Sequence, residues 1–297
     1  MPVPGEPFLF IVMTRLNIAI QKSGRMHDDC MILLRDCGLK IDAGTDQLKT
    51  SAGGFPLDIL YLRNGDIPEY LQDGVVDMAI LGENTVIEKG SKVEKVMPLG
   101  FSKCRLSIAV PQKSGYQDIR YFEGKRIATS YPETLKKYLN EKNIQAEIHE
   151  ISGSVEIAPN IGLADGICDL VSSGNTLFQN KLEEKDILLR SEACIYVNPS
   201  LNAEKKALVG KLLFRIKATL EARMNRYILL NAPKSALDKI IRILPGIKSP
   251  TILPLAEEGW CSVHSVIPEQ QFWEIIDALK EAGAQGILVI PIEKMVS

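Results

Sequence analysis

Short apolar runs alternate with helix-length amphipathic segments over the first two thirds of the chain. Alternation of this kind predicts parallel strands that are joined by crossover helices. The pattern forms two series, within 16–81 and within 105–171, and each series predicts one α/β lobe. Strands near 187–197 and a long helix over 204–223 are expected to carry the chain back to the first lobe. The expected strands are 16–20, 57–62, 77–81, 105–110, 125–129, 146–151 and 168–171, and the expected helices are 26–37, 67–73 and 133–142.

From Arg226 onward the order of elements changes. Predicted strands and helices follow one another as βαββαβ, which is the order of the ferredoxin-like unit. Residues 261–266 alternate between apolar and polar side chains, so the predicted sheet has one covered face. This part of the sequence has no catalytic cluster, so we predict a regulatory or assembly module. The expected strands are 227–230, 251–255, 260–267 and 285–291, and the expected helices are 235–244 and 269–282.

Composition and charge narrow the class of protein. The 297-residue chain is 45% hydrophobic and 24% charged, which is typical of a globular protein of two or three domains. A formal net charge of −2 offers no basic field, so nucleic-acid binding is not expected. The six cysteines show no CxxC spacing, which predicts reduced core residues of a cytoplasmic protein. The apolar run at 8–13 is too short for a membrane span, so residues 1–12 are interpreted as an extension, with Met13 as an alternative start.

A polar turn follows the predicted strand at 168–171. Backbone N–H groups at a helix start have no intrahelical partner, and glycine lets the backbone approach a ligand closely, so this turn suits a phosphate. Asp169, just before the turn, is placed to accept hydrogen bonds from sugar hydroxyls. Local chemistry alone leaves the alternative of an ordinary polar turn that caps a helix. The turn consists of Ser172, Ser173, Gly174, Asn175 and Thr176, and its helix is expected to begin near Leu177.

The whole segment 153–177, which ends with this turn, resembles the phosphoribosyl-pyrophosphate signature of the ATP phosphoribosyltransferase family. Other stretches are similar to the same family, and the likeness covers about residues 13–297. Its C-terminal stretches resemble the long form of the enzyme. The further similar stretches are 15–25, 73–84, 124–132, 249–255 and 287–295.

This resemblance implies a two-lobed, periplasmic-binding-protein-like catalytic region that is followed by a ferredoxin-like regulatory domain. The implied reaction transfers the phosphoribosyl group of phosphoribosyl pyrophosphate to N1 of ATP and releases pyrophosphate, as the first step of histidine biosynthesis. Mg²⁺ is the implied cofactor, histidine and AMP are the implied inhibitors, and a hexamer with a smaller dimeric form is the implied assembly. No nucleic-acid or membrane partner is expected. The implied domains are an extension over 1–12, lobe I over 13–104 plus 190–223, lobe II over 105–189, and a histidine-binding domain over 224–297.

The resemblance also assigns roles to individual residues. Lys22, Arg25 and Asp169 are expected to act in catalysis, although the two cations alone would be interpreted as solvated surface residues. Glu156 is either a metal-binding carboxylate or part of a first helical turn. Asn160 stands where members of the family often carry a basic residue, which puts a phosphate contact there in doubt. The expected contacts are Asp169, Ser172, Ser173, Gly174, Asn175, Thr176 and Leu177 for phosphoribosyl pyrophosphate, Gly24, Arg25, Glu83, Asn84 and Arg105 for ATP, and Asn231, Thr251 and Leu253 for histidine.

Three further interpretations remain open from the residues alone. Ser130 is expected near the N-cap of the helix that Pro132 begins, with its end facing the site as a second possibility. Lys103, close to the crossover between the lobes, has no assigned role. The two-lobed pattern also suits a non-catalytic binding protein or a regulatory sensor of nucleotide and amino acid. The implied reaction needs no strong base, because adenine N1 already has a free lone pair.

Overall fold

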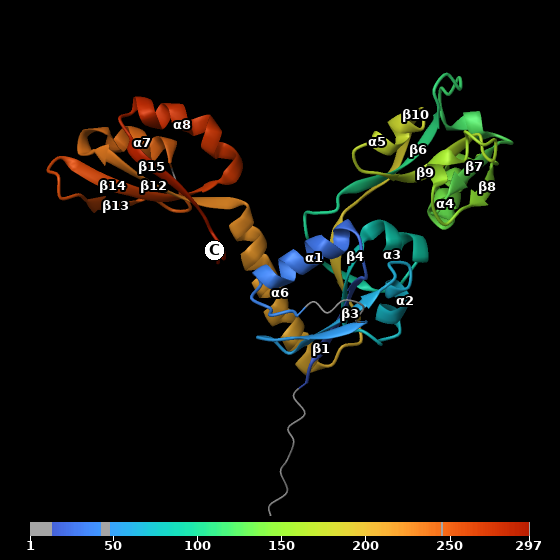
Figure 1. Cartoon of the computed structure of the whole chain (residues 1–297), viewed down its shortest axis with the longest axis horizontal. Coiled ribbons are helices and arrows are strands. Elements are labelled where there is room, and N and C mark those ends of the chain that lie inside the picture. Colours follow the sequence, from blue (N-terminus) through green and yellow to red (C-terminus); the bar gives the residue numbers. More distant parts are fainter. Residues whose placement is uncertain (1–13, 43–47, 245, 297) are drawn as a thin grey trace, which may run out of the picture. The chain divides into compact units, whose positions relative to one another are not determined.

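The computed structural model describes residues 14–42, 48–244 and 246–296 (Figure 1). The predicted extension over residues 1–12 lies outside this part of the chain. The described chain divides into two compact units, of which the first takes the residues up to Arg35 and Leu39–Leu208, and the second takes Asp36–Gly38 and the residues from Val209 onward. Within the described ranges, no helix has the length and apolar character that a membrane crossing requires.

A six-stranded sheet forms the first lobe of the first unit. At its centre β1 (Leu16–Gln21) lies between β3 (Leu57–Leu62) and β4 (Met78–Gly82), and these three strands are parallel. They are followed by α1 (Arg25–Asp36), α2 (Ile67–Gln72) and α3 (Glu83–Lys89), of which the first two were predicted and α3 was not. The sheet order is β2-β3-β1-β4-β11-β5, with β2 at Lys49–Ala52, β5 at Glu94–Pro98 and β11 at Ala193–Val197.

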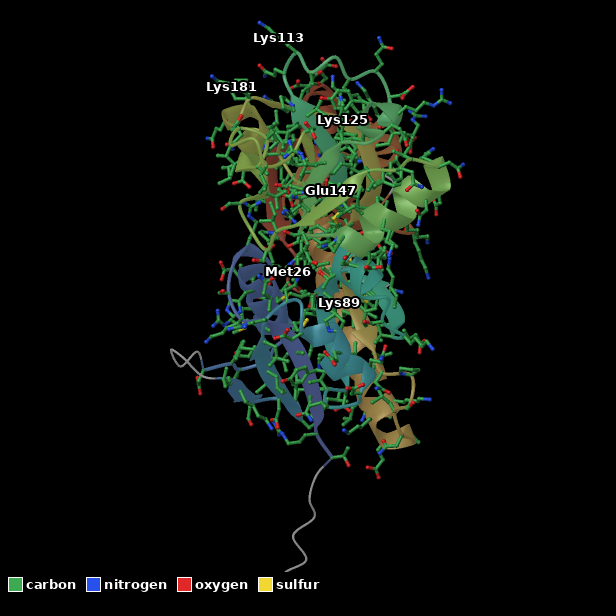
Figure 2. The ribbon with its side chains drawn as sticks, turned by 90° about the vertical axis from the view of Figure 1, so that its right-hand side faces the viewer. Met26, Lys89, Lys113, Lys125, Glu147 and Lys181 are labelled. Carbon is green, nitrogen blue, oxygen red and sulfur yellow. The ribbon has the colours of Figure 1, made fainter. Side chains whose placement is uncertain are left out.

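A five-stranded sheet forms the second lobe of the same unit. Its strands β7 (Arg126–Thr129), β8 (Glu147–Glu150) and β9 (Gly166–Val171) are parallel, and Figure 2 labels Lys125, just before β7, and Glu147, the first residue of β8. Phe122, Ile127 and Cys168 belong to one buried hydrophobic core of this lobe. The order is β10-β6-β9-β7-β8, with β6 at Cys104–Pro111, β10 at Leu182–Ser191, α4 at Pro132–Lys142 and α5 at Asn175–Gln179.

The expectation of parallel strands is wrong for part of each sheet. β6 and β10 are antiparallel to each other, β6 is antiparallel to β9, and β11 is antiparallel to β4. The reason is that the chain crosses between the lobes twice, from β5 to β6 and from β10 to β11. A strand that arrives from the other lobe enters its new sheet where the parallel strands end, so it runs against them. The apolar pattern shows a strand but carries no information on this direction.

The C-terminal part of the second unit has the predicted βαββαβ order. Its sheet is antiparallel in the order β13-β14-β12-β15, with α7 (Leu237–Ile243) and α8 (Phe272–Glu281) packed on one face. The long helix α6 (Ala203–Arg223) precedes this sheet, and the limit between the two units falls inside it, after Leu208. The strands are β12 at Asn225–Pro233, β13 at Thr251–Pro254, β14 at Trp260–Pro268 and β15 at Gln285–Pro291.

Candidate active site

The strand register brings the carboxyl ends of both sheets to the two crossing segments. Ala193, the first residue of β11, pairs with Gly82 at the end of β4. Arg105, near the start of β6, pairs with Val171 at the end of β9. The polar segments that follow β4 and β9 therefore lie next to the lobe connections, where ligands of open α/β sheets bind.

The turn after β9 presents backbone donors outside the helical ladder, of which the Asn175 N–H also donates to Ser173 Oγ at 3.5 Å. Gly174 has a φ of +83° and precedes α5, whose first closing hydrogen bond runs from the Phe178 N–H to the Gly174 carbonyl at 3.0 Å. The N–H groups of Asn175, Thr176 and Leu177 lie before this bond, at the helix end where donors have no intrahelical partner. The helix begins at Asn175, so the expected start near Leu177 is two residues late. Because α5 has only five residues, individual donors matter more than a helix dipole.

A cavity of about 120 Å³ opens beside this turn. Two carboxylates, Glu156 and Asp169, line it together. Burial raises the pKa of Asp169 to about 6, the hydrogen bond from the Leu170 N–H opposes the shift, and the negative charge of Glu156 adds to it. Glu156 lies in a short 3₁₀ turn at Val155–Ile157 and also lines the cavity, whereas metal binding by this carboxylate stays a prediction. The remaining lining residues are Leu170, Val171, Ser172, Ser173, Gly174, Thr176 and Leu177.

Arg105 lies directly behind the turn. Its Nε and Nη2 donate to the two carboxylate oxygens of Glu184, at 2.5 Å each, and its Nη1 donates to the Ser172 carbonyl at 3.2 Å. Ser107 Oγ donates to the same carboxylate at 2.7 Å. The hydrogen bonds from Arg105 hold the pKa of Glu184 below its usual range. A contact between Arg105 and a nucleotide stays a prediction.

The segment after β1 carries two exposed cations. The Lys22 N–H donates to the Leu62 carbonyl at 2.8 Å, which fixes the backbone, while the side chains of Lys22 and Arg25 are exposed. Among the described residues, neither side chain takes part in an ion pair. Gly24 has a φ of +94° and leads into α1. Both cations are thus available to a ligand at this sheet edge.

The segment after β4 is already engaged within the protein. Glu83 pairs with Lys95 at 2.8 Å. Asn84 is buried, accepts a hydrogen bond from Ser191 Oγ at 2.8 Å, and donates from its side-chain amide to the Tyr131 hydroxyl at 3.3 Å. Contacts of Glu83 and Asn84 with ATP stay predictions, and any such contact has to compete with these internal partners.

Three functional candidates were not identified from the sequence. Arg63 is exposed after β3, on the same sheet edge as Lys22, and the strand-end rule applied to β3 would have found it. Glu184 and Glu88 gave no signal, because their partners are distant in the sequence. Glu88 of α3 accepts hydrogen bonds from the N–H groups of Glu133 and Thr134, both at 2.9 Å. This carboxylate from the first lobe caps α4 in the second.

The predicted cap of α4 is wrong. Ser130 Oγ donates to the Ile151 carbonyl instead, and Tyr131 occupies the N-cap position without a side-chain hydrogen bond. Pro132 is the first helical residue, as expected.

Lys103 is exposed in the crossing segment. Asn160 donates to the Asn180 carbonyl at 3.2 Å, next to the end of α5, so it contacts the protein rather than the cavity.

The three candidates for histidine binding share one face of the C-terminal sheet. Leu253 pairs with Ser262, which pairs with Asn231, so these residues form a row across three strands. Thr251 lies two residues before Leu253 on β13 and has the same orientation. The helices pack against the other face, through residues such as Leu230 and Val263.

Comparisons with known proteins agree with this architecture. Residues 63–218 match the ATP phosphoribosyltransferase family, and residues 222–294 match the family described as HisG, C-terminal domain. The ATP phosphoribosyltransferase of Cytophaga hutchinsonii is 54% identical over 283 residues, which cover 95% of this chain and 99% of that protein. The enzyme of the same name from Parabacteroides distasonis is 53% identical over 281 residues, with the same shares covered.

A solved structure shows the same relationship in three dimensions. A chain of the ATP phosphoribosyl transferase (HisG:HisZ) complex from Thermotoga maritima is 29% identical, with a TM-score of 0.62. The match covers 69% of this chain and 98% of that chain. The predicted fold class is confirmed: a two-lobed, periplasmic-binding-protein-like α/β region precedes a ferredoxin-like domain. This chain belongs to the ATP phosphoribosyltransferase family, whose enzymes begin histidine biosynthesis.

Proposed function

We infer that this chain transfers the phosphoribosyl group of phosphoribosyl pyrophosphate to N1 of ATP, giving N1-(5-phospho-β-D-ribosyl)-ATP and pyrophosphate. This is the first step of histidine biosynthesis, and membership of the family carries the conclusion. The observation on this chain that supports it best is the cavity that joins a phosphate-type turn to Asp169. A phosphorylated sugar needs both partners, one for its phosphate and one for its hydroxyls.

In this proposal the turn at 172–176 holds the 5′-phosphate and Asp169 holds the ribose hydroxyls. The N–H groups of Asn175, Thr176 and Leu177 are suited to phosphate oxygens, and the serine and threonine hydroxyls add further donors. Asp169 in its charged form accepts two hydrogen bonds from neighbouring hydroxyls. Such bonds offset the burial that raises its pKa in the free protein.

Bond breaking at the anomeric carbon leaves negative charge on pyrophosphate and positive charge on the ribose ring. Adenine N1 attacks with its own lone pair, so no strong base is needed. Lys22 and Arg25 are exposed cations at the end of β1 and are suited to the polyphosphates of the two substrates. On the ATP side, Gly24, Arg25, Glu83 and Asn84 are the proposed contacts, since they follow the parallel strands β1 and β4. The protein acts mainly by alignment and charge stabilisation.

The donor set fits Mg²⁺ that arrives with the substrate. In the described part of the chain, no group of three or more His, Cys, Asp or Glu side chains could hold a metal ion. Mg²⁺ is commonly bound by one or two carboxylates together with substrate phosphates, and Glu156 and Asp169 supply two carboxylates in one cavity. When bound, the ion would neutralise charge on the departing pyrophosphate.

Pyrophosphate release tests the proposed function directly. The purified chain is mixed with ATP, phosphoribosyl pyrophosphate and Mg²⁺, and we expect pyrophosphate to appear only when all three are present. A matched reaction with GTP in place of ATP controls for simple hydrolysis. Pyrophosphate formation that does not require ATP, or none at all, would contradict the proposed reaction.

The Lys22→Ala variant is expected to lower kcat about 10- to 100-fold, which corresponds to the loss of one charge-assisted contact. Its unfolding midpoint should stay close to wild type, because the Lys22 side chain is exposed. Lys113→Ala is the control, since Lys113 is an exposed cation in the turn that follows the C-terminal end of β6. Figure 2 labels Lys113. Full activity in the Lys22→Ala variant would show that Lys22 is a solvated surface residue with no role in the reaction.

We also propose that the C-terminal module binds histidine and inhibits the enzyme at a distance, with the hexamer as the inhibited assembly and AMP as a second inhibitor. Asn231 and Leu253 lie in one row across the sheet, with Thr251 beside them on the face opposite the helices. A ligand there can change activity only by binding one global arrangement more tightly than another.

Calorimetric titration of histidine into the whole protein, paired with activity assays, tests the regulatory proposal. We expect saturable binding, inhibition that excess substrate does not fully relieve, and weaker binding in Asn231→Ala. Sedimentation in the presence of histidine should show the larger assembly. Inhibition competitive with both substrates, or no heat of binding, would rule the proposal out.

A further inference from the structure

Behind the phosphate turn lies a pair of charged residues that does not line the cavity. The side chains of Arg105 and Glu184 are each about one quarter exposed. They form a bidentate ion pair, in which Arg105 Nε and Nη2 each donate to one carboxylate oxygen of Glu184. Glu184 also accepts from Ser107, so both of its oxygens are bound to β6 side chains. The cavity is lined by Ser172, Ser173 and Gly174 but by neither member of the pair.

The third contact of Arg105 fixes the direction of a peptide group in the turn. Arg105 Nη1 donates to the carbonyl of Ser172, the first residue after β9. In a trans peptide the carbonyl and the next N–H point in opposite directions, and the described chain contains no cis peptide. Holding the Ser172 carbonyl toward Arg105 therefore turns the Ser173 N–H away from Arg105.

This orientation matters for a bound anion. A carbonyl oxygen that pointed toward a phosphate would repel it, whereas an N–H would bind it. A guanidinium forms several hydrogen bonds in one plane, so Arg105 can hold Glu184 and Ser172 together, which a lysine ammonium cannot do with the same geometry. Glu184 keeps the guanidinium in place and cancels its charge, so that Arg105 stays behind the turn.

We propose that Arg105 and Glu184 are positioning residues for phosphoribosyl pyrophosphate, which act by orienting the Ser172–Ser173 peptide of the phosphate turn. This inference rests on the proposed function. It gives Arg105 a role on the phosphate side in place of a contact with the nucleotide, and it gives Glu184 a role that no feature of its sequence indicates.

Steady-state kinetics with each substrate varied separately tests the proposal. Glu184→Gln is expected to raise the KM for phosphoribosyl pyrophosphate about 10-fold and to leave the KM for ATP within about twofold. Arg105→Lys should give the same selective change, and the double variant should be no worse than Arg105→Lys, since the two residues act through one contact. Glu183→Gln is the matched control, because Glu183 is the neighbouring residue on β10 and pairs only with Lys185 among the described residues.

Three outcomes would overturn the positioning role. The first is an unchanged KM for phosphoribosyl pyrophosphate in both single variants. The second is an equal rise in both KM values, which indicates general damage to the lobe, and the third is additive effects in the double variant. If Glu184→Gln does not fold, Arg105→Lys gives the selective KM test by itself. Absence of turnover in wild type would instead overturn the proposed function, and this inference with it.

Discussion

Replacing Asp169 with asparagine is expected to remove most activity while making the free protein more stable at neutral pH. Burial raises the pKa of Asp169 to about 6, against a usual value of 3.8. Between these two values the folded protein keeps a proton that the unfolded chain has released. Stability therefore falls as the pH rises from about 4 to 6 and stays lower above that range.

In the Asp169→Asn variant, the side chain at position 169 is uncharged at all of these pH values. It should gain on the order of 3 kcal/mol of stability relative to wild type above pH 6, and nothing below about pH 4. The Leu170 N–H, which donates to Asp169 Oδ1 at 2.8 Å, keeps an acceptor in the asparagine. Activity should fall at least 100-fold, because two charge-assisted hydrogen bonds to the ribose are weakened.

Urea unfolding at pH 4 and pH 8, combined with turnover assays at pH 8, measures both effects. Asp165→Asn provides a control of opposite sign. Hydrogen bonds from the Arg126 N–H and side chain lower the pKa of Asp165, so its charged form stabilises the fold and the variant should lose stability at pH 8. Retained activity in Asp169→Asn would show that Asp169 does not bind the ribose. Lower stability of this variant than of wild type at pH 8 would contradict the raised pKa of Asp169.

Most elements and the C-terminal topology were predicted from the sequence, whereas β2, α3 and β5 were not. β3 and β15 match their predicted limits, because both are short apolar runs bounded by turn residues. The βαββαβ order fixed the third sheet, since its strands pair in the order that a ferredoxin-like unit requires. The polar turn at 172–176 was located from its own residues and does lead into a helix, but only the family resemblance favoured phosphate binding there, which stays a prediction.

Features that depend on distant partners could not be predicted in this way. The antiparallel direction of β6 and β11 follows from the two lobe crossings, and the cap of α4 comes from Glu88, more than forty residues earlier in the chain. Asn84 was correctly placed after β4, but its burial against Ser191 depends on a pairing between β4 and β11. Amino-acid type and spacing indicate the chemistry of a side chain and its local secondary structure. These contacts depend instead on which distant segments the fold brings together.

Gly174→Val is expected to raise the KM for phosphoribosyl pyrophosphate at least 10-fold while the protein still folds. Gly174 has a φ of +83°, which costs a non-glycine residue roughly 1–2 kcal/mol and a β-branched residue more. A Cβ at this position would meet no atom within 4 Å, so there is no clash to unfold the lobe. The strain is instead relieved by a shift of the turn, which moves the phosphate-binding N–H groups.

Gly115→Val separates strain from function, because it imposes the same backbone penalty elsewhere in the second lobe. Gly115 has a φ of +78° and also has open space around its Cβ position, but it lies in the loop after β6 and does not line the cavity. The two variants should lose similar stability in urea unfolding, and only Gly174→Val should lose affinity for phosphoribosyl pyrophosphate. Because the proposed ATP contacts lie in the segments after β1 and β4, the KM for ATP should change little in either variant. An unchanged KM for phosphoribosyl pyrophosphate in Gly174→Val would place the 5′-phosphate elsewhere, whereas equal losses in both variants would show that the effect is one of stability.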